Sequence, residues 1–372
     1  MTSSLTKLDL RHMRTALTLA RRGLGNVWPN PAVGCVLVRE DLNGRIVGRG
    51  WTQPGGRPHA ETEALRRADK LAQGATAYVT LEPCSHIGKT EPCAAALLEA
   101  GITRVVTSMV DPDPRVKGRG LSQLKTAGVK VIVGMLQREA EDLNAGFISI
   151  NNERRPLVTL KVATTIDGYV ASHTGNSQWI TGKQARKHGH IMRARHDAIL
   201  SGIGTIEADN PMLTCRVHGL EHQSPIRVIM DTNGRLAPNS AIVVSAEKVP
   251  VWRYRAASIP SPLVLPNVDD IASPVGTDGK LMISDIISDL VDRGITRLLV
   301  EAGPKLTTAF LKSGYVDKIY WYRSSGIMGG DGKAAIRSLH IERLTDLKKF
   351  YRMETLPLGP DNLEIYTRPC SA

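Results

Sequence analysis

Three side chains that can bind zinc stand at His59, Cys84 and Cys93. One imidazole and two thiolates are good zinc ligands, and three protein ligands leave the fourth tetrahedral position to a water molecule. Bound zinc lowers the pKa of that water to about 7, so a hydroxide becomes available at neutral pH. Such a hydroxide can attack a ring carbon that bears an amino group. The set therefore predicts a catalytic zinc site that removes an amino group by hydrolysis.

This chemistry also needs a carboxylate near the metal that carries protons to the departing nitrogen. Glu61 holds the place of the glutamate in the pattern His-x-Glu…Pro-Cys-x-x-Cys of zinc nucleobase deaminases. Glu63 is the alternative, because it lies four positions after His59 and therefore on the same helical face. The pattern favours Glu61, whereas helical periodicity alone favours Glu63.

The two cysteines depart from the generic pattern, because they are nine positions apart instead of three. The intervening segment SHIGKTEP must form an excursion that brings both sulfurs to one metal. Cys93 is expected at the start of a helix, where the helix dipole favours the thiolate. A structural zinc is the rival interpretation; it would need a fourth protein ligand, for which His86 is the first candidate. Cys35, inside an apolar strand, is expected to be a core residue.

The first 150 residues alternate between strand and helix patterns, which predicts an α/β unit with a largely parallel sheet. An amphipathic helix is expected near the start of the chain, with Leu8, Met13, Leu17 and Ala20 on its apolar side. The further elements expected are a hairpin over 33–40 and 46–51, strands over 75–83, 102–110 and 129–134, and helices over 59–69, 93–101, 120–128 and 136–151.

The polar run at 151–156 ends in a proline and predicts a boundary between domains 1–152 and 153–372. The second half again has an α/β pattern. Its Pro-, Ser- and Asp-rich region 255–280 is expected to be an exposed loop. Strands are expected over 156–168, 198–206, 225–231, 296–304 and 316–325, and helices over 183–195, 284–294 and 305–314.

Length and composition bound the class of protein. A chain of 372 residues favours two domains, and 42% hydrophobic with 23% charged residues is typical of a soluble globular protein. No run of about 18 apolar residues occurs, so no membrane span is expected. The five cysteines are odd in number and no export signal precedes them, which favours a reduced, cytoplasmic setting over a disulfide framework.

The net charge of +12 is divided evenly, with +6 in residues 1–150 and +6 in the remainder. An even distribution favours a solvated basic surface over a nucleic-acid footprint. Aromatic residues make up 4%, which leaves few stacking platforms for single strands. The alternative of a deaminase for free or RNA-borne bases, with a nucleic-acid-binding second half, is therefore disfavoured.

Longer motifs carry a more specific resemblance. The first half contains PNPAVGCVLV (29–38), PHAETEAL (58–65), AYVTLEPCSHIGKTEPC (77–93), DPDPRVKGRG (111–120) and LNAGF (143–147). The second contains LKVATTIDG (160–168), GNSQWIT (175–181), DNPMLTCR (209–216) and VEAGPKL (300–306). Over nearly its whole length, the chain resembles the bifunctional deaminase/reductase family of riboflavin biosynthesis.

The resemblance implies a cytidine-deaminase-like fold for the N-terminal domain and a dihydrofolate-reductase-like fold for the C-terminal domain. It implies zinc-dependent hydrolytic deamination of 2,5-diamino-6-(5-phosphoribosylamino)pyrimidin-4-one. It further implies NADPH-dependent reduction of the ribosyl group of 5-amino-6-(5-phosphoribosylamino)uracil to ribityl. The expected partner is this phosphoribosylated pyrimidine, with no nucleic acid and no membrane, and a homo-oligomer is expected.

Site residues follow from the resemblance position by position. In the first domain it implies zinc ligands at His59, Cys84 and Cys93, proton transfer by Glu61, and substrate contacts by Asn30, His86 and Lys89. In the second it implies substrate contacts by Ser177, Arg193, Leu213, Arg216 and Glu301. It implies NADPH contacts by Thr164, Trp179, Thr205, Asp209, Thr232, Gly303, Pro304, Lys305, Leu306, Thr307, Thr308 and Ala309.

Lys161 and Asp209 are the candidates for polar assistance to the reduction, because the nicotinamide itself carries the hydride chemistry. Each has a plainer alternative. Lys161 can be a strand residue that faces solvent, and Asp209 an ordinary turn or N-cap residue. Arg193, without the resemblance, would be read as a solvated helix arginine.

Overall fold

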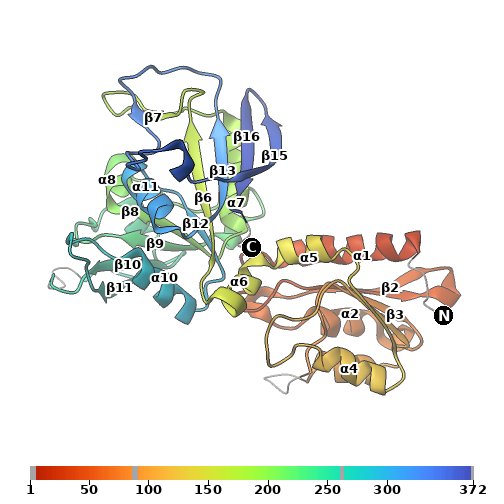
Figure 1. The fold of residues 1–372 in the computed structure, drawn as a ribbon. Helices are drawn as coiled ribbons and strands as arrows, with labels where there is room; N and C mark the ends of the chain where they lie inside the picture. The colour runs from red at the N-terminus through yellow and green to blue at the C-terminus, as the bar shows by residue number, and fades with distance from the viewer. Residues whose placement is uncertain (1–5, 86–90, 260–263, 370–372) are drawn as a thin grey trace. The chain divides into compact units, whose positions relative to one another are not determined.

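The computed structural model describes residues 6–85, 91–259 and 264–369. The chain folds into two compact units, Met1–Arg154 and Arg155–Ala372, which run from red to yellow and from yellow-green to blue in Figure 1. Among the described residues, no helix has both the length and the apolar character that crossing a membrane requires.

The first unit contains a five-stranded sheet in the order β2-β1-β3-β4-β5. β1 is antiparallel to both of its neighbours, and β3, β4 and β5 are parallel. The expected hairpin is therefore confirmed, whereas the expectation of a largely parallel sheet is wrong for this unit, because the hairpin supplies two antiparallel pairings. The strands are β1 (Gly34–Arg39), β2 (Arg45–Trp51), β3 (Thr76–Val79), β4 (Arg104–Thr107) and β5 (Lys130–Val133).

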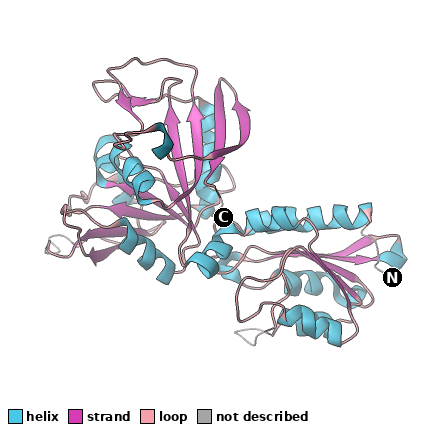
Figure 2. Ribbon diagram, viewed as in Figure 1, coloured by secondary structure: helices cyan, strands magenta, loops and turns pink. Residues whose placement is uncertain are grey.

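Helices cover this sheet, as Figure 2 shows in cyan. They are α1 (Lys7–Ala20), α2 (Ala60–Ala68), α3 (Cys93–Glu99), α4 (Arg119–Thr126), α5 (Gln137–Leu143) and α6 (Ala145–Glu153). Two glycines let helices pack directly on the hairpin: a Cβ at Gly34 would lie 1.9 Å from the Ala16 carbonyl oxygen, and one at Gly50 would lie 2.0 Å from that of Ala60. The close approach at Gly50 fixes the first turn of α2.

Two details of the first unit differ from expectation. Leu8 is 44% exposed, because the apolar side of α1 is formed by Met13, Ala16, Leu17 and Ala20. The single helix expected over 136–151 is divided into α5 and α6 at Asn144. The side-chain amide of Asn144 bonds the backbone of Ala32 in both directions, which ties the break to the start of the hairpin.

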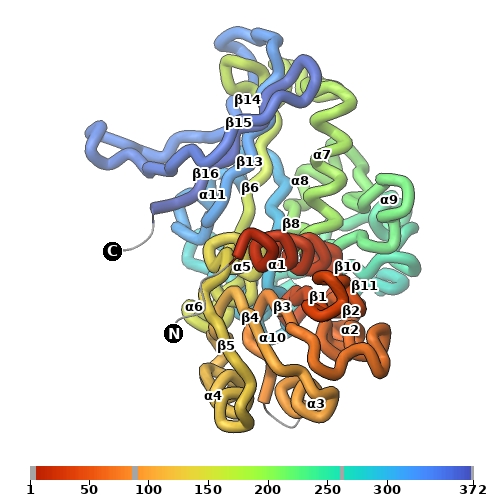
Figure 3. Tube along the Cα trace, turned by 90° about the vertical axis from the view of Figure 1, so that its right-hand side faces the viewer, coloured from red at the N-terminus to blue at the C-terminus, as the bar shows by residue number. Residues whose placement is uncertain are grey.

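The second unit contains a nine-stranded sheet in the order β11-β10-β9-β8-β12-β6-β13-β16-β15. The seven strands from β11 to β13 are parallel, and β16 is antiparallel to both β13 and β15. The long strands β6 and β13 run side by side in Figures 1 and 3. The strands are β6 (Leu157–Thr164), β8 (Ala198–Gly202), β9 (Ile226–Met230), β10 (Val251–Ala256), β11 (Val268–Ser273), β12 (Arg297–Val300), β13 (Val316–Arg323), β15 (Tyr351–Leu358) and β16 (Asp361–Thr367).

The helices of this unit are α7 (Lys183–Ala194), α8 (Ile203–Asp209), α9 (Ala241–Val244), α10 (Ile283–Asp292) and α11 (Pro304–Ser313), and a small second sheet pairs β7 (Tyr169–Ala171) with β14 (Lys333–Ala334). The strand expected over 198–206 ends at Gly202, where α8 begins. The loop expected over 255–280 contains the edge strand β11, whose mostly exposed or half-buried residues hide the strand signal.

Parallel strands place their carboxyl ends at one edge of a sheet, and ligands of α/β proteins bind outside that edge. In this unit the edge is formed by the ends of the neighbouring strands β9, β8, β12 and β6. Several residues implicated by the sequence lie there, as described below.

Candidate functional sites

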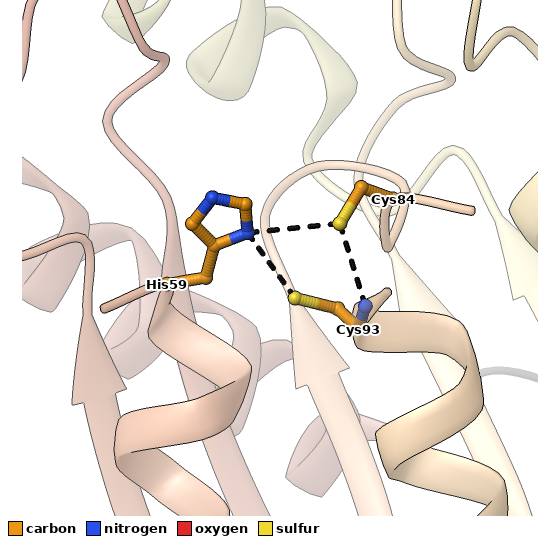
Figure 4. Close-up of side chains that lie close together, drawn as sticks. All are labelled: His59, Cys84 and Cys93. Carbon is orange, nitrogen blue, oxygen red and sulfur yellow. Dashed lines mark hydrogen bonds between the residues drawn. The ribbon is translucent and has the colours of Figure 1, made fainter. Parts of the chain in front are cut away.

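The three expected zinc ligands converge in the first unit (Figure 4). His59 lies immediately before α2, Cys84 follows β3, and Cys93 is the first residue of α3. His59 Nδ1 lies 3.2 Å from Cys93 Sγ and 3.6 Å from Cys84 Sγ. All three ligand atoms lie within 4.8 Å of one another. The nine-residue spacing is accommodated because the Ala94 amide donates to the Cys84 carbonyl, which holds the start of α3 against the loop.

These distances fit a tetrahedral zinc ion. With Zn–N and Zn–S bonds of about 2.0 and 2.3 Å, neighbouring ligand atoms should be roughly 3.5 Å apart. The observed separations from His59 Nδ1 bracket this value. The cluster of possible metal ligands among the described residues has three members, which is the donor set of an open zinc site. His86, the candidate fourth ligand of a structural zinc, lies outside the described residues.

The two thiols are electrostatically unequal. The hydrogen bond from Cys93 lowers the pKa of Cys84 to about 4, with a further contribution from His59. The same bond, together with burial, raises the pKa of Cys93 well above its usual range. The bond with Cys84 likewise raises the pKa of His59. The protonation states of the three groups are therefore coupled to one another.

Glu61 and Glu63 have different surroundings. Glu61 is buried on the first turn of α2; burial first, and then the Cys84 charge, raise its pKa to about 7. Its carboxyl also hydrogen-bonds the Cys93 thiol. Glu63 instead pairs with Arg66 and Arg67 on its own helix, at 3.2 and 3.0 Å. The pattern-based choice of Glu61 therefore agrees with where the two carboxyl groups point.

Of the expected pocket residues, Asn30 lies against the loop that leads to His59. A Cβ on Gly56 would lie 2.0 Å from Asn30 Nδ2, so only a glycine at position 56 allows this packing. The φ of Gly56, +82°, also favours glycine. His86 and Lys89 lie outside the described residues, and their contacts stay a prediction.

One residue beside the site was missed from the sequence. Glu82 is buried two positions before Cys84, and its carboxylate accepts backbone N–H bonds at 2.9 to 3.3 Å from four residues that follow β4: Asp111, Gly118, Gly120 and Leu121. It therefore shapes the loop between β4 and α4. A charged residue directly before Pro83-Cys84 in an apolar stretch was the available signal, since buried carboxylates need such partners.

In the second unit, Glu301 follows β12 and gathers two cations. Its Oε1 accepts from Lys161 Nζ at 3.2 Å and from the Arg193 guanidinium at 2.9 Å. Burial alone would raise the pKa of Glu301, but Arg193 and Lys161 hold it well below its usual range. The Arg193 side chain is largely buried and ion-paired, so the simpler interpretation of a solvated arginine is wrong. Lys161 is likewise bound by Glu301 instead of standing free in solvent.

Most of the expected cofactor residues lie at the carboxyl edge of the parallel strands. Thr232 follows β9, Thr205 stands on α8 just after β8, Gly303 follows β12 and Thr164 ends β6. The Gly303 amide donates to Thr205 Oγ1 at 3.1 Å, which joins two of these connections directly. Thr164 Oγ1 accepts from Trp321 Nε1 at 2.8 Å. Six further members of this set, Pro304, Lys305, Leu306, Thr307, Thr308 and Ala309, form the first turns of α11.

The other expected contacts are more exposed or serve the core. Ser177 Oγ donates to Asp209 Oδ1 at 3.5 Å, and Asp209 is the last residue of α8. Trp179 is 67% exposed, with the Arg186 guanidinium 4.6 Å from its ring centroid. Leu213 is buried in the core that also contains Ile199 and Ile229. Arg216 is exposed and lies three positions after Leu213, in the connection between α8 and β9.

Comparisons with known proteins cover both units. Residues 6–109 match the model of the cytidine and deoxycytidylate deaminase zinc-binding region, and residues 156–361 match that of the RibD C-terminal domain. The riboflavin biosynthesis protein RibD of Escherichia coli strain K12 is 40% identical over 364 residues, which cover 95% of this chain and 97% of that protein. That of Aquifex aeolicus strain VF5 is 37% identical, over 97% and 99% of the two chains.

Two solved structures agree over the whole length. RibD of Acinetobacter baumannii has a TM-score of 0.86 at 35% identity, covering 98% of this chain and 99% of that one. The diaminohydroxyphosphoribosylaminopyrimidine deaminase/5-amino-6-(5-phosphoribosylamino)uracil reductase of Thermotoga maritima has the same score, identity and coverage. The predicted fold class is confirmed: a cytidine-deaminase-like domain precedes a dihydrofolate-reductase-like domain.

The zinc-binding deaminase match on one unit and the reductase match on the other lead to the same conclusion as the full-length relatives. The chain belongs to the RibD family of riboflavin biosynthesis proteins, bifunctional enzymes that combine a deaminase with a reductase.

Proposed function

We propose that residues 1–152 deaminate 2,5-diamino-6-(5-phosphoribosylamino)pyrimidin-4-one and that residues 153–372 reduce the ribosyl group of the product with NADPH. The observation that carries the first half is the convergence of His59, Cys84 and Cys93 beside the buried carboxyl of Glu61. The substrate is the one that the Thermotoga maritima enzyme's name implies.

In the deaminase, His59, Cys84 and Cys93 would hold zinc, which supplies a hydroxide at neutral pH when it is bound. Glu61 holds and delivers the proton: its pKa of about 7 lets the carboxyl both accept a proton and return it to the leaving amino nitrogen. Asn30, His86 and Lys89 are assigned to substrate binding. Hydrolysis replaces the amino group by oxygen and releases ammonia.

In the reductase, NADPH supplies the hydride, and the chain supplies position and charge. The cofactor is assigned to the carboxyl edge formed by Thr164, Thr205, Thr232 and the segment from Gly303 to Ala309, with Trp179 and Asp209 beside it. The start of α11 is suited to an anion, because the helix dipole places partial positive charge at a helix N-terminus. A strand–glycine–helix connection is common in α/β folds, so the connection alone does not identify a cofactor site. The assignment rests on the chemistry of the residues around it.

The substrate is assigned to the cationic end of the same edge. Arg193 and Arg216 can bind the ribose phosphate, since a guanidinium suits a phosphate in a bidentate arrangement. Ser177, Leu213 and Glu301 complete the proposed contacts. Lys161 and Asp209 are assigned polar assistance to the reduction, and Glu301 holds Lys161 in place through a hydrogen bond of 3.2 Å.

A coupled assay on the full chain tests this assignment. The diaminopyrimidine substrate should release ammonia, and NADPH should then be oxidised in equal amount. A zinc-replete protein that releases no ammonia would favour a structural zinc. Tight, salt-sensitive RNA binding without NADPH binding would favour the nucleic-acid alternative. Either result would contradict the proposal.

A further inference from the structure

His190, on α7, stands between the two arginines assigned to the substrate phosphate. Its Nδ1 lies 3.1 Å from the Thr214 carbonyl oxygen, and its Nε2 lies 3.5 Å from the Arg216 guanidinium. The Thr214 carbonyl also accepts from the Arg193 guanidinium at 3.0 Å. His190 is thereby linked through shared partners to Arg193 on one side and to Arg216 on the other. The sequence motifs gave it no role.

His190 Nδ1 faces both the Thr214 carbonyl oxygen and the Arg216 backbone N–H, the latter at 3.3 Å. When no anion is present, a proton on Nδ1 bonds the carbonyl and leaves the lone pair of Nε2 to accept from the Arg216 guanidinium, so this tautomer serves the two stronger partners. An imidazolium has no lone pair, so its Nε2–H would face the Arg216 cation without an acceptor. A second proton therefore becomes favourable where an anion lies between the ring and the guanidinium.

We propose that His190 is a phosphate-recognition residue of the reductase: it holds Arg216 when neutral and takes up a proton to bind the substrate phosphate together with Arg193 and Arg216. This inference rests on the proposed function, because it assumes a phosphorylated reductase substrate. The cationic set then has three members that face one anion, and charge-assisted hydrogen bonds to phosphate are the strong ones.

The charges around the ring fit this role. Burial, and then Arg193 and Arg216, lower the pKa of His190 to about 4, against the smaller opposing effect of Glu301. Among the described residues, the charged groups that act on it are Arg193 on α7, Arg216 on the connection after α8, and Glu301 after β12. A phosphate dianion would reverse the balance and raise the pKa in the complex. Binding then takes up a proton, so this part of the affinity is lost as the pH rises through the raised value.

The test compares the wild-type full chain with His190→Asn and His190→Gln, using the deaminated substrate with and without its phosphate. At pH 6 the variants should raise KM for the phosphorylated substrate on the order of tenfold, the effect of one charge-assisted hydrogen bond. KM for the dephosphorylated substrate and kcat for both should change less than about twofold. The ratio of variant to wild-type KM should fall as the pH rises. His218→Asn is the matched control, since His218 is an exposed histidine two positions after Arg216 in the sequence.

The outcomes separate this inference from the proposed function. A wild-type protein that oxidises no NADPH with the phosphorylated substrate contradicts the proposed function itself. If the wild type is active, an equal rise of KM for both substrates overturns the phosphate role and leaves His190 as a structural residue. A KM ratio that does not change with pH overturns the proton uptake that the proposal requires.

Discussion

Glu301 accepts a hydrogen bond from Lys161 at 3.2 Å, and the pairing of Leu160 with Val300 places Lys161 of β6 level with the residue that directly follows β12. The carboxylate also pairs with Arg193, so it neutralises two cations at once. Replacing it by the neutral amide in Glu301→Gln leaves both cations uncompensated in a poorly solvated place. We expect the kcat/KM of reduction to fall on the order of a hundredfold, because Lys161 and Arg193 lose the group that holds them in place, and a displacement of about 1 Å at an active site can cost that much.

Parallel measurements of NADPH oxidation and ammonia release check this expectation, and deamination should be unchanged. Glu364→Gln is a matched control, since Glu364 is a largely buried carboxylate paired with Arg323 at 3.2 Å outside the proposed site. If both variants slow reduction equally, a general loss of ion pairing explains the effect and the role of Glu301 is refuted.

The two glutamates of α2 offer an internally matched pair. Glu61 contacts the thiol cluster, whereas Glu63 pairs with Arg66 and Arg67. Glu61→Gln should lower the kcat of deamination by about two to four orders of magnitude, the usual contribution of a general acid–base group. Glu63→Gln should keep kcat within a few-fold, and both variants should reduce the deaminated substrate normally. Single-turnover ammonia release decides between them; comparable loss in Glu63→Gln would revive the periodicity argument.

The zinc site should control one activity and spare the other. Cys93→Ser, or incubation with a strong chelator, should remove bound zinc and abolish deamination, while NADPH oxidation with the deaminated substrate continues. Metal content and both activities are measured on the same samples. Cys215→Ser is the control, because Cys215 is a buried free cysteine of the second unit. Deamination that survives complete zinc removal would refute the catalytic role of the metal.

Sequence reasoning succeeded where the chemistry of single residues carries the information. His59, Cys84 and Cys93 have few other uses in that combination, and the structure brings them together. It was weaker where the role of a residue depends on a contact with a distant part of the chain. Helical periodicity alone favoured Glu63 over Glu61, because what distinguishes them is the thiols of Cys84 and Cys93, from other parts of the chain, and the arginines of their own helix. The edge strand β11 was missed because it is polar, and its pairing with β10 supplies what its composition lacks.

The supporting residues escaped for the same reason. The partners of Glu82 lie 29 to 39 positions further along the chain, and the ring of His190 is oriented by the connection that contains Thr214 and Arg216. No spacing within the sequence reports such contacts. The break at Asn144, which bonds Ala32 more than a hundred residues earlier, is another example.

The loop held by Glu82 gives a prediction about support of the zinc site. Glu82→Gln keeps the shape of the side chain, but its amide nitrogen would meet backbone N–H groups that now donate to an oxygen. We expect a loss of about 1–3 kcal/mol in unfolding free energy of the first unit and at least a tenfold fall in deamination. Reduction should be unchanged.

Hydrogen exchange of the amides of Gly118, Gly120 and Leu121 checks the mechanism, because these amides should lose protection. Glu40→Gln is a suitable comparison, since Glu40 is an exposed carboxylate that pairs with Arg104 at 3.3 Å. Normal protection of the three amides together with impaired deamination would place the effect elsewhere than in the loop.

The buried His196 predicts an acid sensitivity of the second unit. Its Nδ1 lies 2.7 Å from the Met192 carbonyl and its Nε2 lies 3.0 Å from Thr159 Oγ1, and burial lowers its pKa to about 3. The folded unit therefore keeps His196 neutral, whereas the unfolded chain protonates it below its ordinary pKa of about 6.5. Since the unfolded state binds more protons between pH 6.5 and 3, the stabilisation is complete above pH 6.5 and is lost as the pH falls through this window.

At pH 5 this group should lower the unfolding free energy by about 2 kcal/mol relative to pH 7, from roughly 1.4 kcal/mol for each pH unit below 6.5. Urea unfolding at both values, with hydrogen exchange in β8 reporting on the second unit, measures the loss. Other histidines also titrate in this range, so the decisive quantity is the difference from His196→Gln, whose amide can serve both partners but cannot take up the proton. The variant should be less sensitive to pH by that amount, and an equal pH dependence in the two proteins would show that His196 does not carry it.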